Sequence, residues 1–282
     1  MRKTESYYHY NRSISINIFF FDSLSWIELI YIFYIGDHYE ENNEADFFKI
    51  KEAAYDRLRP DGISVWFWAS LVLSAIMTLI PNYVLTKSGF DGSPFLTMTI
   101  DIAKIFLAIQ LGLAIFFTLE PIAYSLQKLQ SNIVSIVVIK VSLDMYLFYF
   151  TVTETTFGTP DYLTNTGLIL MAGGFVFLAL STIRAIKRVK QGELRKEGKG
   201  LYNFRKSKGY VSLPIIFAAT MIVGAFARSF SDAAGNMTMF LILLLCVVLQ
   251  YGIAMAWPEF LLLTYGKFKF ESFIVPRRKR RK

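Results

Sequence analysis

The sequence predicts an all-α integral membrane protein, and three observations support this class. Of the 282 residues, 54% are hydrophobic and only 18% are charged, which is too apolar for an ordinary water-soluble domain. The apolar residues gather into long runs, and a helix needs roughly 20 of them to cross a hydrocarbon core about 30 Å thick. Lysine and arginine cluster in the segments that flank alternate runs. We therefore expect a bundle of membrane-spanning helices.

Six apolar runs meet this length requirement, and we predict that they form three helical hairpins. The first is uncharged and opens with Trp66, Phe67 and Trp68, an aromatic cluster typical of the headgroup level. A tight turn, 231–236, separates the last two runs. The predicted membrane domain is 63–257, and its six spans are 63–85, 95–119, 133–151, 167–183, 210–226 and 237–257.

The positive residues predict the orientation, because those beside the spans remain in the cytoplasm. The basic loop 184–209 holds ten of them and the tail 258–282 holds eight, whereas the three alternate loops together hold only Lys87. We expect a multi-pass protein of the cell membrane with both termini in the cytoplasm. The tail should face anionic lipid headgroups, which account for its charge without nucleic-acid binding. Its lipid-facing residues are Arg277, Arg278, Lys279, Arg280, Arg281 and Lys282.

The N-terminal segment 1–62 is predicted to be cytoplasmic or interfacial. Its apolar stretch 14–35 is long enough to cross, but Asp22 and Glu28 fall near its middle, where a charge costs about 3 kcal/mol. Polar and apolar residues alternate over 13–18, which is typical of a strand. We expect a β-hairpin there, and a similar alternation predicts a strand over 265–271. If 14–35 did span, the N-terminus would lie outside.

Two charged pairs inside the predicted spans are the candidate site residues. Asp101 and Lys104 are three residues apart, and Lys140 and Asp144 are four apart, so each pair lies on one face of its helix. Either the pairs border an ion or proton pathway where spans two and three meet, or they neutralise themselves and hold the helices together. The pair Gly173-Gly174 is likewise either a close helix contact or a helix break at a binding site.

Side chains for catalysis and metal binding are scarce. One cysteine, Cys246, and two histidines, His9 and His38, leave little from which to build a zinc site or a nucleophile pair. The common phosphate-binding, dinucleotide-binding and hydrolase motifs do not occur. Asp101 and Asp144 could form a carboxylate pair, but each has a nearer lysine that favours its ionised form. We expect a protein that is not an enzyme and holds no cofactor or metal.

The N-terminal part of the chain resembles a known membrane family. The run Phe21-Asp22-Ser23-Leu24-Ser25-Trp26 precedes an aromatic stretch and an acidic connector, and Val65-Trp66-Phe67-Trp68 then opens the first hairpin. This layout, over about the first 190 residues, is similar to the tandem five-transmembrane proteins of Gram-positive bacteria. Some of them are immunity proteins against toxins of type VII secretion. The sixth predicted span departs from that family, and no functional residue is carried over.

These observations favour a non-enzymatic binding protein of a bacterial membrane. Its expected partners are the lipid bilayer and another membrane protein, with immunity against a membrane-active toxin as the specific role. The first alternative is a transporter or permease subunit whose ion pathway passes the charged pairs of spans two and three. The second alternative is a scaffold for an envelope complex.

Overall fold

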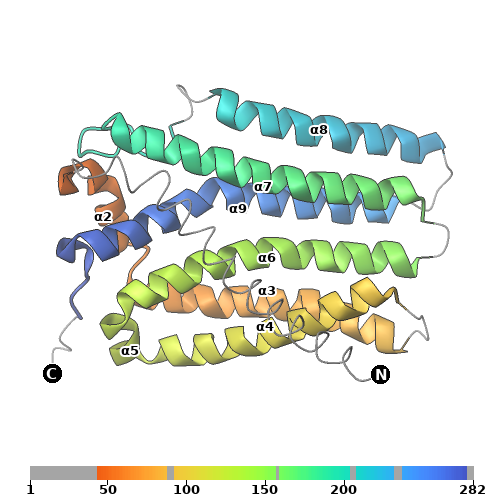
Figure 1. Ribbon diagram of the computed structural model, residues 1–282, viewed down its shortest axis with the longest axis horizontal. Helices are drawn as coiled ribbons and strands as arrows, with labels where there is room; N and C mark the ends of the chain where they lie inside the picture. The colour runs from red at the N-terminus through yellow and green to blue at the C-terminus, as the bar shows by residue number, and fades with distance from the viewer. Residues whose placement is uncertain (1–42, 88–91, 157–158, 204–207, 232–236, 278–282) are drawn as a thin grey trace, which may run out of the picture. The chain divides into compact units, whose positions relative to one another are not determined.

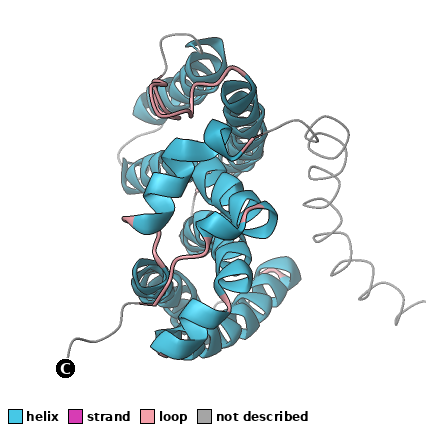
Figure 2. Ribbon diagram, turned by 90° about the vertical axis from the view of Figure 1, so that its left-hand side faces the viewer, coloured by secondary structure: helices cyan, strands magenta, loops and turns pink. Residues whose placement is uncertain are grey.

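The computed structural model describes residues 43–87, 92–156, 159–203, 208–231 and 237–277, and every regular element in these ranges is a helix. Figure 2 shows the long helices of this part joined by loops. Residues 44–282 form one unit, distinct from 1–43. The β-hairpin predicted near the N-terminus lies outside the described residues, as does the question of whether 14–35 spans.

Six long helices make up the described unit, and shorter helical elements flank them. The long helices are α3 (Pro60–Lys87), α4 (Pro94–Thr118), α6 (Gln127–Thr155), α7 (Asp161–Lys190), α8 (Lys208–Ser231) and α9 (Met237–Lys269). The short elements are η2 (Glu44–Phe47), α2 (Phe48–Tyr55), α5 (Glu120–Ser125) and η3 (Glu271–Phe273).

Five of the long helices, α3, α4, α6, α7 and α9, are long and apolar enough to cross a membrane. Each coincides with a predicted span, and most extend beyond it because polar residues continue the helix past the apolar run. The longest extension at a single end is in α9, whose 33 residues measure about 50 Å against a hydrocarbon core of about 30 Å. The helix α8 covers the predicted span 210–226, but its described apolar stretch, Pro214–Gly224, is shorter.

The long helices lie in the spatial order α8, α7, α9, α6, α3, α4 (Figure 1). The last helix, α9, therefore lies between α6 and α7, so these two are not neighbours in the order although a short connection joins them. Of the predicted hairpins, only α3 with α4 is a directly adjacent pair in it. The central helix α6 is the most buried of the five apolar helices, and α4, at one edge, is the least buried.

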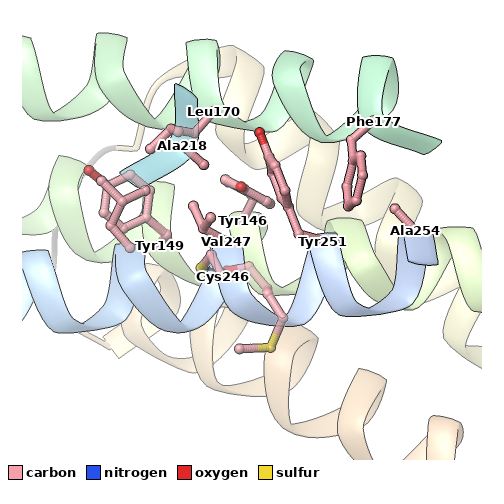
Figure 3. Packing of buried hydrophobic residues seen from close by; sticks show 11 residues of the cluster. Tyr146, Tyr149, Leu170, Phe177, Ala218, Cys246, Val247, Tyr251 and Ala254 are labelled. Atoms are coloured by element: carbon pink, nitrogen blue, oxygen red, sulfur yellow. Dashed lines mark hydrogen bonds between the residues drawn. The ribbon is translucent and has the colours of Figure 1, made fainter. Parts of the chain in front are cut away.

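The core between α6, α7 and α9 contains a cluster of aromatic and aliphatic side chains (Figure 3), and two of these helices approach closely. Tyr146 of α6 and Tyr251 of α9 are both buried in it. A Cβ atom on Gly174 of α7 would lie 2.1 Å from the side chain of Gln250 in α9, so only glycine fits there. Because α7 is continuous through Gly173 and Gly174, the helix-contact interpretation is confirmed and the helix break is wrong.

At one end of the unit, segments from three parts of the chain pack against the extension of α9. We call residues 44–58, 191–203 and 270–277 the cap. Phe47 is fully buried, with its ring centroid 5.4 Å from that of Tyr265 and 5.7 Å from that of Phe270. The backbone N–H of Lys49 donates to the carbonyl of Leu194 at 2.9 Å, which joins the first two segments.

Two predictions about this end are corrected. The strand predicted over 265–271 is wrong, because α9 remains helical to Lys269 and η3 follows. Contacts with α2 and α6 bury the α9 extension, and this packing overrides the alternating pattern. The basic loop predicted to begin at residue 184 begins after Lys190, where α7 ends. Arg184 and Arg188 are therefore buried helix residues and do not face lipid.

Candidate functional site

The pair Lys140 and Asp144 of α6 lies inside the bundle. The Nζ atom of Lys140 is 2.7 Å from Oδ2 of Asp144, and their side chains are 18% and 6% exposed. The hydroxyl of Ser74 in α3 donates to the same Oδ2 atom at 2.5 Å. The carboxylate is thus neutralised within its own helix and tied to a second helix, which is how a buried charge avoids a large desolvation cost.

This pair is the centre of a polar network that reaches α4. Lys140 Nζ donates to Oε1 of Gln110 at 3.4 Å, and Gln110 Nε2 donates to the hydroxyl of Ser70 at 3.0 Å. Ser70, Ser74, Gln110 and Asp144 are all buried. We call these residues with Lys140 the buried network. It joins α3, α4 and α6 at one register, because sliding any helix would leave a buried polar group without its partner.

The other predicted pair lies on the outer surface of α4. Asp101 Oδ1 is 2.6 Å from Lys104 Nζ, and the two side chains are 61% and 41% exposed. Lys104 Nζ also donates to Oδ1 of Asn82 in α3 at 3.2 Å. We call Asn82, Asp101 and Lys104 the outer patch. The face of α4 that packs inward is formed by Leu96, Ile100 and Ala103.

The depth of the outer patch is unusual for an exposed ion pair. Lys104 lies about ten residues from the start of the 25-residue helix α4, which corresponds to about 15 Å. Asp101 lies seven residues, about 10 Å, from that start, and Asn82 lies five residues, about 8 Å, from the end of α3, so the outer patch extends from near this end of the bundle toward its middle. A charged pair that faces outward at this depth is costly in lipid unless something polar covers it. The two predicted pairs therefore occupy different environments, one inside the bundle and one on its surface.

A third polar centre organises the cap. Glu259, buried in the α9 extension, accepts hydrogen bonds from the Arg57 guanidinium and, at 2.5 Å, from the Tyr202 hydroxyl. The hydrogen bond to Glu259 raises the pKa of Arg57, whereas burial, followed by the bond to Glu259, raises the pKa of Tyr202. Arg57 therefore stays charged and Tyr202 stays protonated at physiological pH. One carboxylate thus fastens two cap segments to α9.

Several basic side chains of the predicted basic loop and of the predicted lipid-facing tail bind other groups of the protein. Arg184 Nη2 donates to the carbonyl of Leu201 at 2.7 Å, and Arg188 donates to the carbonyl of Asn203. Arg195 Nε is 2.6 Å from Asp46 Oδ1 in the cap. In the predicted lipid-facing tail, Arg277 Nη2 is 3.3 Å from Glu120 Oε2. The remainder of that tail, 278–282, lies outside the described residues.

Sequence reasoning found the two charged pairs but missed their partners in other helices. Ser74 and Gln110 complete the buried network, and Asn82 completes the outer patch. The sequence does contain a pattern that indicates the partners in α3. Polar residues recur at every fourth position of this helix, at Ser70, Ser74, Thr78 and Asn82. That spacing places them on one helix face. Gln110 has no such signal, because it is the single polar residue in the apolar stretch that follows Lys104.

No cluster of histidine, cysteine, aspartate or glutamate that could hold a metal ion occurs in the ranges that the structure describes. Comparison with family models, with curated proteins and with solved structures finds no match.

Proposed function

We propose that this chain is a multi-pass membrane protein that binds a partner helix within the bilayer through the outer patch. Its five long apolar helices support the membrane location. We assign α8 as a sixth crossing, because an even number of crossings keeps the basic loop and the basic tail on one side. By the positive-inside rule that side is the cytoplasm, and the cap lies there.

The exposure of Asp101 and Lys104 within a helix that is long and apolar enough to cross a membrane carries this proposal. Contact between these side chains and lipid is unfavourable, whereas a partner helix with a hydrogen-bonding side chain at the same depth would satisfy them. The surrounding surface of α4 is apolar and exposed, as expected for a face that packs against another helix. Its large exposed residues include Met98, Ile105 and Ile109. The partner that fits is an apolar helix with one polar residue at the depth of the patch.

We propose a membrane-active toxin as the source of that helix. A toxin helix held against α4 inside the bilayer could not join the assembly that opens a pore. The low content of catalytic side chains supports a role by binding, and so does the resemblance of the N-terminal layout to a family that includes immunity proteins. A stable envelope complex held through the same patch is the alternative that the experiments below would reveal.

Protection of sensitive cells tests the function. Cells that express the chain should survive cognate toxin candidates, and the double variant Asp101→Leu with Lys104→Leu should lose at least about tenfold of that protection. The matched control is Glu120→Leu with Arg277→Leu, which removes an exposed ion pair outside the spans. Unchanged killing of cells with the natural chain, across the cognate candidates, would contradict the proposal.

Photo-crosslinking tests the site of contact. A photoreactive residue at Ile105, on the exposed side of α4, should form an adduct with the toxin that protects against it. The control position is Val176 of α7, which is similarly exposed but far from the patch in the helix order. Equal adducts at both positions would show that the toxin contacts the bundle without using the outer patch.

Transport is the second candidate function, and the buried network supports it. An ion pair held inside a membrane bundle is typical of ion and proton pathways. The discriminating measurement is ion flux in proteoliposomes. If Asp101→Asn and Asp144→Asn leave a measured flux unchanged, these carboxylates are structural and transport does not depend on them.

A further inference from the structure

A row of polar residues of α3 lies between the buried network and the outer patch. Ser70, Ser74, Thr78 and Asn82 follow one another at intervals of four residues, so they line one face of the helix. We call them the α3 stripe. Ser70 and Ser74 belong to the buried network, and Asn82 belongs to the outer patch. Each step along the stripe measures about 6 Å.

Thr78 is the residue of the stripe whose pairing is incomplete. Its side chain is fully buried, and its hydroxyl oxygen has no hydrogen-bond partner in the part of the chain that the structure describes. A buried hydroxyl without a partner costs about 1 to 3 kcal/mol. One water with two hydrogen bonds of about 2.8 Å each spans a step of about 6 Å. Water between Thr78 and its stripe neighbours, Ser74 and Asn82, would therefore satisfy this hydroxyl.

The stripe is closed at its other end by an aromatic stack. One turn before Ser70, the ring of Phe67 stacks on that of Phe117 in α4, with centroids 5.3 Å apart and an interplanar angle of 10°. Both rings are fully buried. The next polar residue toward the cap, Ser64, belongs to a separate group with Gln130. Because Asn82 lies five residues, about 8 Å, from the end of α3, water could enter the stripe from that end of the bundle but not pass the stack.

We infer that the α3 stripe is a hydrated half-path that delivers protons from the outer patch to Asp144. Proton delivery is a function beyond partner binding. It rests on the transport candidate and identifies the transported ion as the proton. Lys140 and Ser74 both donate to Oδ2 of Asp144, which leaves Oδ1 to take up the proton. Hydronium transfers a proton to Oδ1, an O–H bond forms and water is released, while the Lys140 ammonium keeps its charge.

Cysteine accessibility tests the hydration of the stripe. The chain has one cysteine, so Cys246→Ser provides a background without thiols. The test variant is Thr78→Cys, and the matched control is Thr151→Cys, whose native hydroxyl is buried but donates to the carbonyl of Leu147 in α6. The silver ion is small enough for a path one water wide, and it reacts with thiolates, which form where water reaches the thiol.

The half-path predicts that Thr78→Cys is labelled at least about tenfold faster than Thr151→Cys, and only from the membrane side where α4 begins. Equal rates at the two positions would overturn the inference, because Thr78 would then be as dry as an ordinary buried residue. Equal labelling of Thr78→Cys from both sides would also overturn it, since the aromatic stack would not close the path.

Proton flux in proteoliposomes tests what the path carries. The half-path ends at Asp144, so net flux also requires release of the proton to the other side, a step that belongs to the transport cycle on which this inference rests. With that release, we expect Thr78→Val to reduce proton flux at least about tenfold and Thr151→Val to leave it near the natural rate. Proton flux that is insensitive to Thr78→Val, or flux of other ions without protons, would overturn the half-path and leave transport standing. Absence of any ion flux would contradict the transport candidate as well as the proton delivery inferred from it.

Discussion

Lys140 and Asp144 depend on each other because both are held inside the bundle. Removing the carboxylate by Asp144→Leu leaves an ammonium group without its counter-ion, which typically costs about 3 to 5 kcal/mol. Removing both charges, by Lys140→Met with Asp144→Leu, should recover most of that loss. Unfolding in detergent measures both effects. A double variant no more stable than Asp144→Leu alone would show that the lysine contributes little to the cost.

Gly174 allows α7 and α9 to approach, and its substitution gives a second prediction. The new Cβ atom of Gly174→Ala would displace Gln250, whose amide is held by the Tyr146 hydroxyl at 2.9 Å and the Met171 carbonyl at 3.0 Å. We expect a loss of about 1 to 3 kcal/mol in unfolding free energy.

The matched control for Gly174 lies in the neighbouring helix. A Cβ atom on Gly252 of α9 would have no neighbour within 4 Å, so Gly252→Ala should leave stability unchanged or raise it by up to about 1 kcal/mol. The two variants are compared by thermal unfolding in the same detergent. Similar losses in both would contradict the close approach at Gly174.

The two ion pairs were predictable at the residue scale because they are local. Spacings of three and four residues bring Asp101 to Lys104 and Lys140 to Asp144 on any helix. Their environments were not predictable, since the outward face of α4 depends on which side packs against α3 and α6. Partners such as Ser74 come from helices distant in sequence, and spacing within one helix does not indicate them.

At the scale of elements, Glu259 holds the cap together. Glu259→Gln would weaken the charged hydrogen bonds from Arg57 and Tyr202, each typically stronger than a neutral one. Arg57 is more than half exposed, so we expect a modest loss, about 1.4 kcal/mol, and about tenfold faster trypsin cleavage in 191–203. The control is Glu197→Gln in the same exposed segment. Equal cleavage of both variants would show that Glu259 does not hold this segment.

The apolar runs were sufficient to locate the long helices but not their ends or neighbours. Hydrophobicity marks where lipid can be crossed, so the run 237–257 identified α9. The helix continues to Lys269 because the cap buries its extension. This burial comes from tertiary packing, which the local alternation of residues over 265–271 does not indicate. The insertion of α9 between α6 and α7 depends on side-chain fit, for example at Gly174, and hydropathy carries no information about it.

In the whole molecule, three groups of polar residues have different tasks. The cap engages many of the basic side chains, the buried network fixes the register of α3, α4 and α6, and the outer patch is the surface that we propose for a partner. The mouth of the α3 stripe, at Asn82, belongs to that same patch. A partner seated on the patch would cover the mouth, so the binding and the proton delivery that we propose would oppose each other.

We propose that the bundle crosses the membrane with its cap in the cytoplasm. Single cysteines at Thr159, in a short connection at the opposite end, and at Lys199, in the cap, test it most directly in the Cys246→Ser background. On intact cells, an impermeant maleimide should label Thr159→Cys at once and Lys199→Cys only after the membrane is opened. Labelling of Lys199→Cys on intact cells, or of both positions from one side, would contradict the account.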